Sequence, residues 1–232
     1  MAAPERFYEL CAEYGIHPQP ADLEKHEKYL RLLLAENQVM NLTAATTGED
    51  AWLRHIGDSL LLVRLVEKGG TAIDVGTGGG LPGIPLAIQR PELVLTLLEA
   101  TNKKCRFLER AVAELELENV TVRCDRSEIA ARDASLRESF DYAIARALAP
   151  LPVLLELTVP FLCEGGRVLA MKGARAHEEL SAAKDALTKL HCSLEEILES
   201  GESGSRILVI RKKAPTPDIY PRRTGIPTKR PL

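Results

Sequence analysis

Aromatic side chains are scarce in this sequence, at 4% of its 232 residues, so its core must be built mostly from Leu, Val, Ile and Ala. No uninterrupted apolar run approaches the roughly 18 residues that a membrane-spanning helix needs. The closest stretch, residues 147–163, is interrupted by Glu156 and by three prolines. The N-terminus also lacks a basic patch followed by an apolar segment, so we expect neither a secretory signal nor a membrane partner.

Paired cysteines are missing as well. The five cysteines are odd in number and never spaced as CxxC, which argues against a disulfide framework and against a zinc site. None lies in a sequence context typical of an activated nucleophile. We therefore expect a cytoplasmic chain with no metal and with reduced thiols at Cys11, Cys105, Cys124, Cys163 and Cys192.

The charges are distributed unevenly, although the formal net charge is only −3. Residues 211–232 carry seven Lys or Arg and one Asp, a balance of +6, while the rest carries 23 basic and 32 acidic residues, a balance of −9. A basic tail on an acidic body binds an anionic partner or serves only as a solubilising end. The charge pattern alone leaves both readings open.

The chain divides into three zones. Residues 1–68 show helical periodicity in two stretches and predict a small helical cap. Residues 69–213 alternate between short apolar strands and helix-compatible segments. Residues 214–232 hold five of the 14 prolines without an apolar period, which predicts an extended arm that does not pack as an element.

The middle zone predicts an α/β fold with seven strands. Repeated strand–helix units form a parallel sheet with helices on both faces. The last two strands lie too close together for a crossover helix, so they predict a hairpin that brings antiparallel pairing into the sheet. The strands are expected at 71–75, 93–98, 120–124, 141–145, 167–171, 193–198 and 206–211, and the helices between them at 82–89, 103–117, 127–137, 151–162 and 176–190.

A glycine-rich loop follows the first strand. Open parallel sheets bind ligands beyond the carboxyl ends of their strands, and glycines let a ligand lie against bare backbone. Residues 78–83 match GxGxxG, which is also found in nicotinamide and flavin sites. Asp74, just before the loop, would repel a pyrophosphate but suits the ammonium and sulfonium of S-adenosylmethionine. Its alternative reading is a cap on the next helix.

The next strand ends supply further candidates. Glu99 lies 23 residues beyond Gly76, where a carboxylate accepts hydrogen bonds from the ribose of an adenosine. Ser127 and Glu128 follow the third strand, where an adenine edge would lie, although both also suit a helix start.

Arg146 ends the fourth strand. The acidic or amide residue, two prolines and aromatic typical of exocyclic-amine methylation are absent here, and so is the cysteine that a cytosine-C5 enzyme needs. The remaining acceptor is one that is already nucleophilic, such as a ring nitrogen. Arg146 alone could equally be a salt-bridge partner, Lys172 could meet phosphate or water, and His55 could be catalytic or packed.

The chain resembles, over nearly its whole length, the small-subunit ribosomal RNA guanine-N7 methyltransferases once called glucose-inhibited division protein B. The combination of motifs is more specific than the glycine loop alone. The motifs are Asn41-Leu-Thr-Ala44, Arg54-His55 with Asp58-Ser-Leu60, Asp74-Val-Gly-Thr-Gly78, Leu81-Pro-Gly-Ile-Pro-Leu86, Arg146-Ala147, Met171-Lys-Gly173, Tyr220-Pro-Arg-Arg223, Gly225, Pro227 and Pro231-Leu232.

The resemblance implies a Rossmann-like class I methyltransferase sheet preceded by a helical cap, with S-adenosylmethionine as donor and a guanosine of a decoding-region stem-loop in 16S ribosomal RNA as acceptor. We expect a monomer. The Glu at position 99 departs mildly from the family, which often has Asp there. The implied donor-binding residues are Gly76, Gly78, Leu81, Glu99, Ala100, Thr101, Ser127, Glu128 and Arg146, and the expected phosphate contacts are Lys172, Arg222, Arg223, Lys229 and Arg230, with Lys103 as a further candidate.

The expected mechanism needs no general base, because guanine N7 carries an in-plane lone pair. Arg146 is expected to position the donor or a phosphate rather than the reacting ring. Three alternatives remain at this stage: a nicotinamide oxidoreductase, a methyltransferase of another RNA, a protein or a small molecule, and a non-catalytic ribosome assembly factor.

Overall fold

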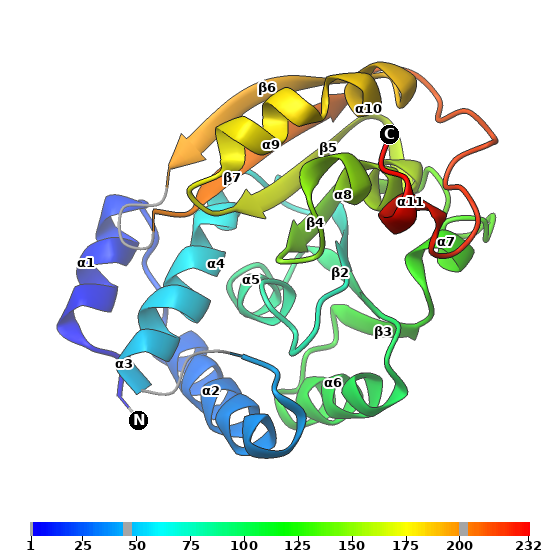
Figure 1. Ribbon diagram of the computed structural model, residues 1–232. Coiled ribbons are helices and arrows are strands. Elements are labelled where there is room, and N and C mark those ends of the chain that lie inside the picture. Colours follow the sequence, from blue (N-terminus) through cyan, green and yellow to red (C-terminus); the bar gives the residue numbers. More distant parts are fainter. Residues whose placement is uncertain (1, 44–47, 200–203) are drawn as a thin grey trace.

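The computed structural model describes residues 2–43, 48–199 and 204–232. They form one seven-stranded sheet with helices on both faces (Figure 1). The order across the sheet is β3-β2-β1-β4-β5-β7-β6. The strands are β1 (Thr71–Val75), β2 (Val94–Glu99), β3 (Val120–Cys124), β4 (Phe140–Arg146), β5 (Leu162–Lys172), β6 (Cys192–Glu199) and β7 (Arg206–Lys212).

The pairing confirms the expected fold class. Strands β1 to β5 pair in parallel, and β7 lies antiparallel between β5 and β6. Strand β5 begins five residues before the expected start at Arg167, because Gly165 and Gly166 interrupt the apolar alternation without ending the strand. Part of the loop between the hairpin strands, residues 200–203, lies outside the described residues.

The helices differ more from expectation than the strands. Helix α1 was not expected, and the second cap stretch is divided into short α, π and 3-10 turns. None of the helices in the three described ranges is long and apolar enough to cross a membrane. The helical elements are α1 (Glu5–Glu13), α2 (Pro20–Met40), α3 (Gly48–Ala51), η1 (Trp52–Gly57), α4 (Asp58–Leu60), η2 (Leu61–Arg64), α5 (Gly83–Gln89), α6 (Asn102–Glu114), α7 (Ser127–Ala130), α8 (Leu151–Thr158), η3 (Val159–Phe161), α9 (Ala176–Ala182), α10 (Lys184–Lys189) and α11 (Ile226–Lys229).

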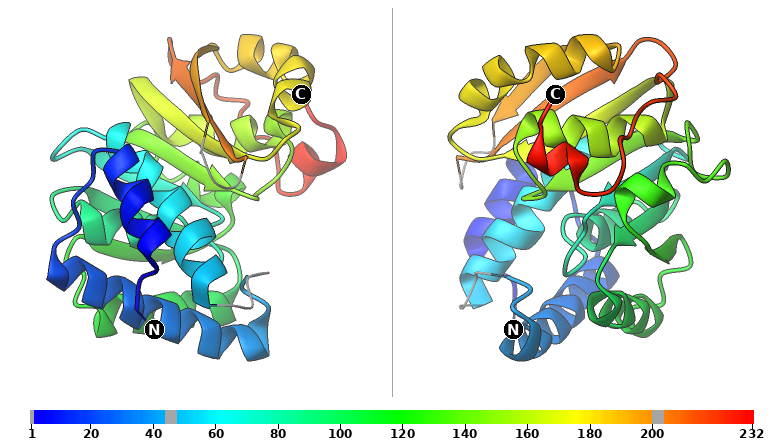
Figure 2. Two further views of the ribbon diagram at one scale, coloured as in Figure 1. Left: turned by 90° about the vertical axis from the view of Figure 1, so that its left-hand side faces the viewer. Right: turned by 45° about the vertical axis from the view of Figure 1, so that its right-hand side comes forward.

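Alternation along the strands divides the core in two. Ala72 and Leu97 face α2, α4, α5 and α6, whereas Ile73 and Val75 face α8, α9 and α10. Figure 2 shows these two helical layers from the side. Because a strand turns successive side chains to opposite faces, one apolar run supplies both clusters. The cap helices share the first cluster with the sheet, so they are built onto the core of the sheet domain.

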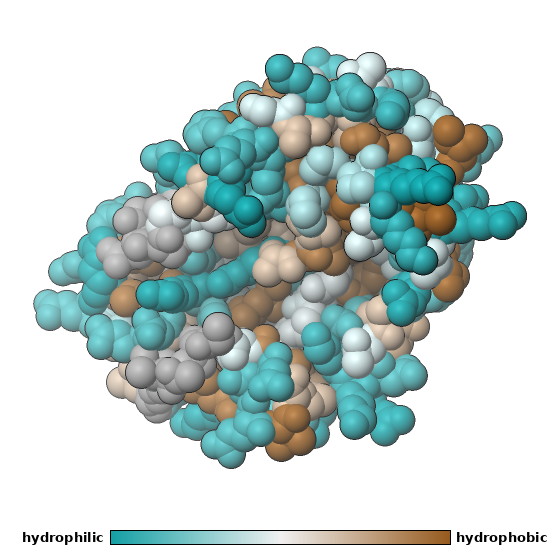
Figure 3. Space-filling view, viewed as in Figure 1, coloured by the Kyte–Doolittle hydropathy of each residue, from teal (hydrophilic) through white to brown (hydrophobic). Residues whose placement is uncertain are grey.

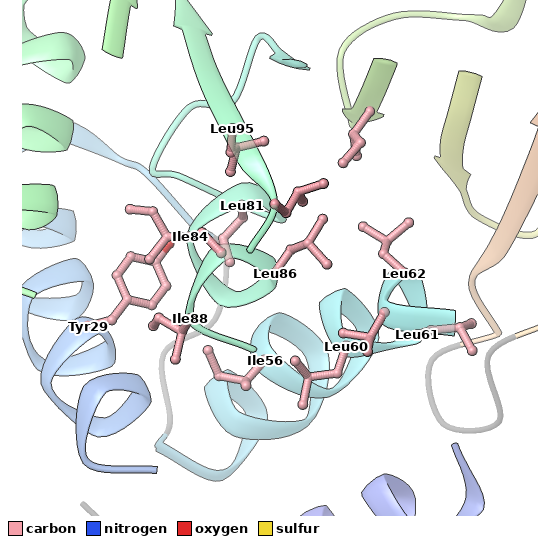
Figure 4. Close-up of a cluster of buried hydrophobic side chains, with 14 of the residues drawn as sticks. Tyr29, Ile56, Leu60, Leu61, Leu62, Leu81, Ile84, Leu86, Ile88 and Leu95 are labelled. Atoms are coloured by element: carbon pink, nitrogen blue, oxygen red, sulfur yellow. The ribbon is translucent and has the colours of Figure 1, made fainter. Parts of the chain in front are cut away.

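Helix α5 lies at the centre of the first cluster (Figure 4). Its side chains Ile84 and Ile88 face Tyr29 of α2, while Ile56 approaches from the other cap segment. The hydroxyl of Tyr29 donates a hydrogen bond of 2.8 Å to the carbonyl of Gly79. The cap therefore holds the glycine-rich loop directly.

The C-terminal arm packs against the sheet domain, so the expectation of an unpacked arm is wrong. Tyr220 is buried in the second cluster. Arg137 donates hydrogen bonds to the carbonyls of Thr216 and Tyr220, and Arg132 donates one to the carbonyl of Pro221. These hydrogen bonds go to backbone carbonyls of the arm. Such bonds need no regularly spaced apolar side chains, so the sequence of the arm shows no hydrophobic period.

Two cysteines also differ from expectation. Cys105 and Cys124 are joined as a disulfide, with their Cα atoms 5.8 Å apart, so the expectation of five free thiols is wrong. Cys124 ends β3 in register with Glu99 of β2, and Cys105 lies in the first turn of α6, which follows that strand end. Parallel strand order brings the two residues together, and no local spacing motif marks the pair.

His26 makes the stability of the cap depend on pH. It is fully buried on α2 beside Trp52, and burial lowers its pKa to about 3. The unfolded chain binds this proton near pH 6.5, so stability is lost as the pH falls below that value. Between pH 7 and pH 5 we expect a loss of about 2 kcal/mol from this residue.

Urea unfolding of His26→Leu at both pH values measures that loss. The variant should show a pH dependence flatter by about 2 kcal/mol than the parent chain. His177→Leu, at an exposed position on α9, is the matched control and should keep the parent's dependence. Equal pH dependence in the parent and in His26→Leu would contradict the assignment.

Candidate functional site

A pocket of about 340 Å³ opens beyond the carboxyl ends of β1 and β2. This is the edge at which open parallel sheets bind ligands. The same edge faces the reader in Figure 3, where the surface is hollowed near its middle. The walls come from four parts of the chain, namely Val75 and Gly76, Leu98 to Ala100, Asp125 to Glu128, and Ala147 to Ala149 with Leu157 and Thr228.

Glu99 joins two of these walls. Its Oε2 accepts a hydrogen bond of 3.1 Å from the amide of Gly78, and its Oε1 accepts one of 2.8 Å from the amide of Thr101. The residue is buried, with 7% of its surface exposed. Each carboxylate oxygen can accept further hydrogen bonds, so the group is fixed and still able to bind a ligand.

Two glycines in the loop are required for different reasons. Gly76 has φ +69°, and a Cβ there would lie 2.5 Å from Leu148 Cδ1 across the pocket. Gly83 lies where α5 meets the sheet, and a Cβ there would lie 2.8 Å from Asp74 Oδ2. The first glycine keeps the pocket open, whereas the second allows the helix to pack.

Asp74 acts within the protein. It is fully buried, and its Oδ2 accepts hydrogen bonds from the Thr77 hydroxyl at 2.6 Å and from the Gly83 amide at 2.9 Å. Burial raises the pKa of Asp74 to about 7. Its Oδ1 is buried and has no hydrogen-bond partner among the described residues. The residue does not line the pocket, and its bonds through Oδ2 fit the capping reading of this carboxyl.

A second pocket, of about 360 Å³, adjoins the first. Both are lined by Ala147 and Ala149, so the loop after β4 is a shared wall. Arg146 lines the second pocket from the end of β4. The two pockets are therefore neighbours on either side of this loop, so molecules bound in them would lie close together.

Arg146 is largely buried, and one of its guanidinium nitrogens, Nη1, has no hydrogen-bond partner among the described residues. Burial lowers the pKa of this guanidinium, while Asp58, Tyr29 and Asp74 raise it. The residue is therefore a cation in the wall of the second pocket, next to the loop that both pockets share, within the electrostatic influence of Asp58 and Asp74.

Comparison with known proteins identifies the family. A family model described as "rRNA small subunit methyltransferase G" and named GidB matches residues 22–209. The chain belongs to the GidB family. This confirms the resemblance drawn from the motifs.

The relatives of this GidB-family chain match it over nearly its whole length. "Ribosomal RNA small subunit methyltransferase G" of Moorella thermoacetica is 42% identical and covers 94% of this chain and 93% of its own length. The protein of the same name from Streptococcus pneumoniae is 39% identical, with 99% of each chain covered.

Solved structures share the fold. A putative S-adenosyl-L-methionine-dependent methyltransferase from Methanococcus maripaludis superimposes with a TM-score of 0.58 at 14% identity, over 82% of this chain and 94% of its own. A putative O-methyltransferase from Klebsiella pneumoniae gives 0.55 at 16% identity, over 80% and 90%. At these identities the likeness establishes the architecture alone.

His55 and the Asn-Leu-Thr segment, two motifs of the GidB-family sequence without an assigned role, meet beside Arg146. The His55 Nε2 is hydrogen-bonded to the Thr43 hydroxyl. Burial and, to a smaller extent, the charge of Arg146 together lower the pKa of His55 to about 4, so the ring is neutral at pH 7. Ser205, which lines the second pocket, donates a 3.4 Å hydrogen bond to Asp58.

Several expected ligand residues have partners inside the protein. Leu81 is buried in the first core cluster (Figure 4). The Ser127 hydroxyl donates to the carbonyl of Leu157, and Glu128 Oε1 accepts from the amide of Gly225. The first pocket is lined by Gly76, Glu99, Ala100, Ser127 and Glu128, whereas Gly78 and Thr101 contribute through their amides to Glu99.

Two of the five expected phosphate contacts are paired internally. Lys172 is 7% exposed at its side chain and binds the Ala149 carbonyl and Glu179. Arg222 forms a salt bridge of 2.6 Å with the fully buried side chain of Glu156. Both cations therefore hold carboxylate partners that are distant in sequence, which charge counting could not reveal. Their expected contacts with phosphate stay a prediction.

Sequence reasoning missed Thr228, which brings the arm to the wall of the first pocket. It also missed Leu148, whose side chain lies opposite Gly76. Neither residue is of a type that signals chemistry. Only the packing of the arm and of the loop after β4 places them at the site.

Proposed function

We propose that this GidB-family enzyme transfers a methyl group from S-adenosylmethionine to N7 of a guanosine in a decoding-region stem-loop of 16S ribosomal RNA. The observation that carries the proposal is the pair of adjoining pockets that share the loop at Ala147 and Ala149. One pocket presents the fixed carboxylate of Glu99, and the other presents the buried cation Arg146. We further infer a cytoplasmic monomer.

The residues of the first pocket fit the adenosine of such a donor. The bare backbone at Gly76 leaves a cradle that a Cβ would fill. Glu99 has two oxygens oriented by backbone amides, and ribose hydroxyls are the donors that such a carboxylate accepts at this strand end. Ser127 and Glu128 also line this pocket, and they would hold the adenine. When bound, the donor supplies an electrophilic methyl carbon on a sulfonium.

The protein's part in the reaction is alignment. Guanine N7 needs no deprotonation, and His55 is neutral and hydrogen-bonded to Thr43, so no general base is assigned. Holding two reactants in line can supply about 7–11 kcal/mol. The purine gains positive charge as it is methylated, and carboxylates such as Asp58 offset the charge of Arg146 at this place. Arg146 then positions the donor or a phosphate without opposing that charge.

The remaining basic residues of the arm supply the RNA contacts. Arg223, Lys229 and Arg230 are exposed, and they flank Thr228, which lines the first pocket. Arg222 and Lys172 hold the arm and the loop after β4 in place. The arm thus brings free positive charge to the rim of the pocket, where a negatively charged RNA backbone would pass.

Glu99→Gln should weaken binding of S-adenosylmethionine. The loss of a charge-assisted hydrogen bond costs about 1.5–3 kcal/mol, which is roughly a 10- to 150-fold rise in Kd. Isothermal titration calorimetry measures this directly. Glu118→Gln, an exposed change of the same charge, should leave Kd as in the parent chain. If Glu99→Gln and the control bound S-adenosylmethionine equally well, Glu99 would not be a donor-binding residue.

Methyl-labelled donor distinguishes the function from its alternatives. The labelled donor is incubated with the enzyme and with naked small-subunit RNA, assembled small subunits, bulk protein or a small-molecule pool. Label is expected in the ribosomal RNA. Calorimetric binding of NAD in place of S-adenosylmethionine would favour an oxidoreductase, and donor binding without any label transfer would favour an assembly factor.

A further inference from the structure

A third hollow, of about 550 Å³, lies between the C-terminal end of α2 and the first turns of α6. We call it the α2–α6 groove. It belongs to neither pocket described above. The residues of its wall that matter here are Val39, Met40, Lys103, Lys104, Arg106 and Arg110.

The groove is strongly basic. Its wall holds four Lys or Arg residues and one acidic residue, Glu36. Arg110 is used within the protein, because it forms an ion pair with Glu36 and stacks over the Phe107 ring at 5.6 Å. Among the described residues, Lys103, Lys104 and Arg106 have no ion-pair or hydrogen-bond partner. The side chains of these three residues are therefore available to an anionic ligand, although the chain outside residues 211–232 carries a net negative charge.

Apolar surface accompanies these cations. Val39 is 80% exposed near the end of α2, and Met40 beside it is half-buried. Figure 3 shows hydrophobic and hydrophilic side chains side by side over the lower edge, where α2 and α6 lie in Figure 1. A positively charged groove can follow the backbone of single-stranded nucleic acid. The apolar side chains of α2 on the facing wall offer a surface on which a base or sugar can pack.

The position of the groove connects it to both pockets. Thr101 lines the groove, while its chain neighbours Glu99 and Ala100 line the first pocket. At the other wall, α2 ends at Met40, and Thr43 soon afterwards contacts His55, which is within the electrostatic influence of Arg146 of the second pocket. A strand lying in the groove would therefore lead to the junction of the two pockets.

We propose that the α2–α6 groove binds a single-stranded RNA segment flanking the target guanosine. Phosphates contact Lys103, Lys104 and Arg106, and a base or sugar packs on Val39 and Met40. The inference rests on the proposed function, and it adds a second RNA contact on the side of the site opposite the C-terminal arm. An acidic protein segment is the competing occupant that the experiment excludes.

The test compares two double variants of the full chain that remove the same charge. Lys103→Gln/Arg106→Gln alters the groove, and Lys184→Gln/Lys189→Gln alters exposed residues of α10 on the other face of the sheet. Binding of a small-subunit RNA stem-loop is measured at several salt concentrations. The groove variant should lower the log–log salt slope by about 1.4–1.8, the value for two lost phosphate contacts, and the control should not. Calorimetric affinity for S-adenosylmethionine should be the same in both.

A third variant, Val39→Ser, tests the apolar part. It should weaken RNA binding several-fold without changing the salt slope, because no charge is removed. A groove variant with the slope and affinity of the control would overturn the inference, and the groove would then be open to a protein partner. Methylation by the parent chain is measured separately. If the parent chain does not methylate the RNA but the groove variant still lowers the salt slope, the proposed function is wrong and the RNA-binding groove is retained. If the parent chain neither methylates nor binds the RNA, both proposals are wrong.

Discussion

Arg146→Ala is expected to lower kcat/KM for methyl transfer by about 100- to 1,000-fold, the range measured when a preorganised polar group is removed from an active site. The guanidinium is a partly buried cation in the wall of the second pocket, with Nη1 unpartnered among the described residues. Its removal takes away a positive charge that interacts with Asp58 and Asp74. Single-turnover methylation and donor calorimetry on the same preparations separate the loss of rate from the loss of donor affinity.

Arg146→Lys distinguishes charge from shape. Lysine keeps the positive charge but not the planar fork, so the conservative variant should recover only part of the rate. Arg31→Ala, an exposed arginine of α2 paired with Glu27, is the control for a general loss of charge and should retain the parent's activity. If Arg146→Ala kept both donor affinity and turnover, Arg146 would be only a salt-bridge partner.

Arg222→Ala is expected to lower the free energy of unfolding by about 3–5 kcal/mol, the usual cost of leaving one partner of a buried ion pair alone. The Glu156 side chain is fully buried and accepts hydrogen bonds from the Arg222 amide and guanidinium at 2.6–3.1 Å. Urea unfolding measures the loss. Because the arm also reaches the first pocket through Thr228, donor affinity should fall with it.

The neighbouring residue supplies the control for this second prediction. Arg223 is exposed, so Arg223→Ala should change stability by no more than about 0.5 kcal/mol. It should instead lower the salt slope of RNA binding by about 0.7–0.9, the value for one lost phosphate contact. Equal effects of the two substitutions on stability would show that the Arg222–Glu156 pair does not anchor the arm.

The sheet could be predicted from the sequence because its signals are local. The limits of β1 and β3 agree with those expected, since each is a short run of strand-forming residues that turn signals bound. The rule that parallel strands end at one edge then brings Gly76, Glu99 and Ser127 to one pocket, although no two of them are close in sequence. This part of the site could therefore be predicted from the order of the strands along the chain.

The remainder depended on pairs that sequence spacing does not reveal. Arg222 and Glu156 lie 66 residues apart, and a basic, proline-rich tail looks the same whether its charges meet phosphate or a buried carboxylate. Asp74 has the residue type of a ligand contact, but its Oδ2 accepts hydrogen bonds from the Thr77 hydroxyl and the Gly83 amide. The Cys105–Cys124 pair follows only from the neighbouring positions of β2 and β3. Which partner a charged or polar side chain contacts depends on the tertiary structure, so the sequence alone does not predict it.

The most direct measurement is the position of the methyl group on the RNA. Small-subunit RNA treated with the enzyme and S-adenosylmethionine is digested with nuclease, and the fragments are analysed by mass spectrometry. We predict a single 7-methylguanosine in a stem-loop of the decoding region, absent when Arg146→Ala replaces the parent chain. A methyl group on an exocyclic amine, on a ribose or on cytosine, or RNA without any added methyl, would contradict the proposed function.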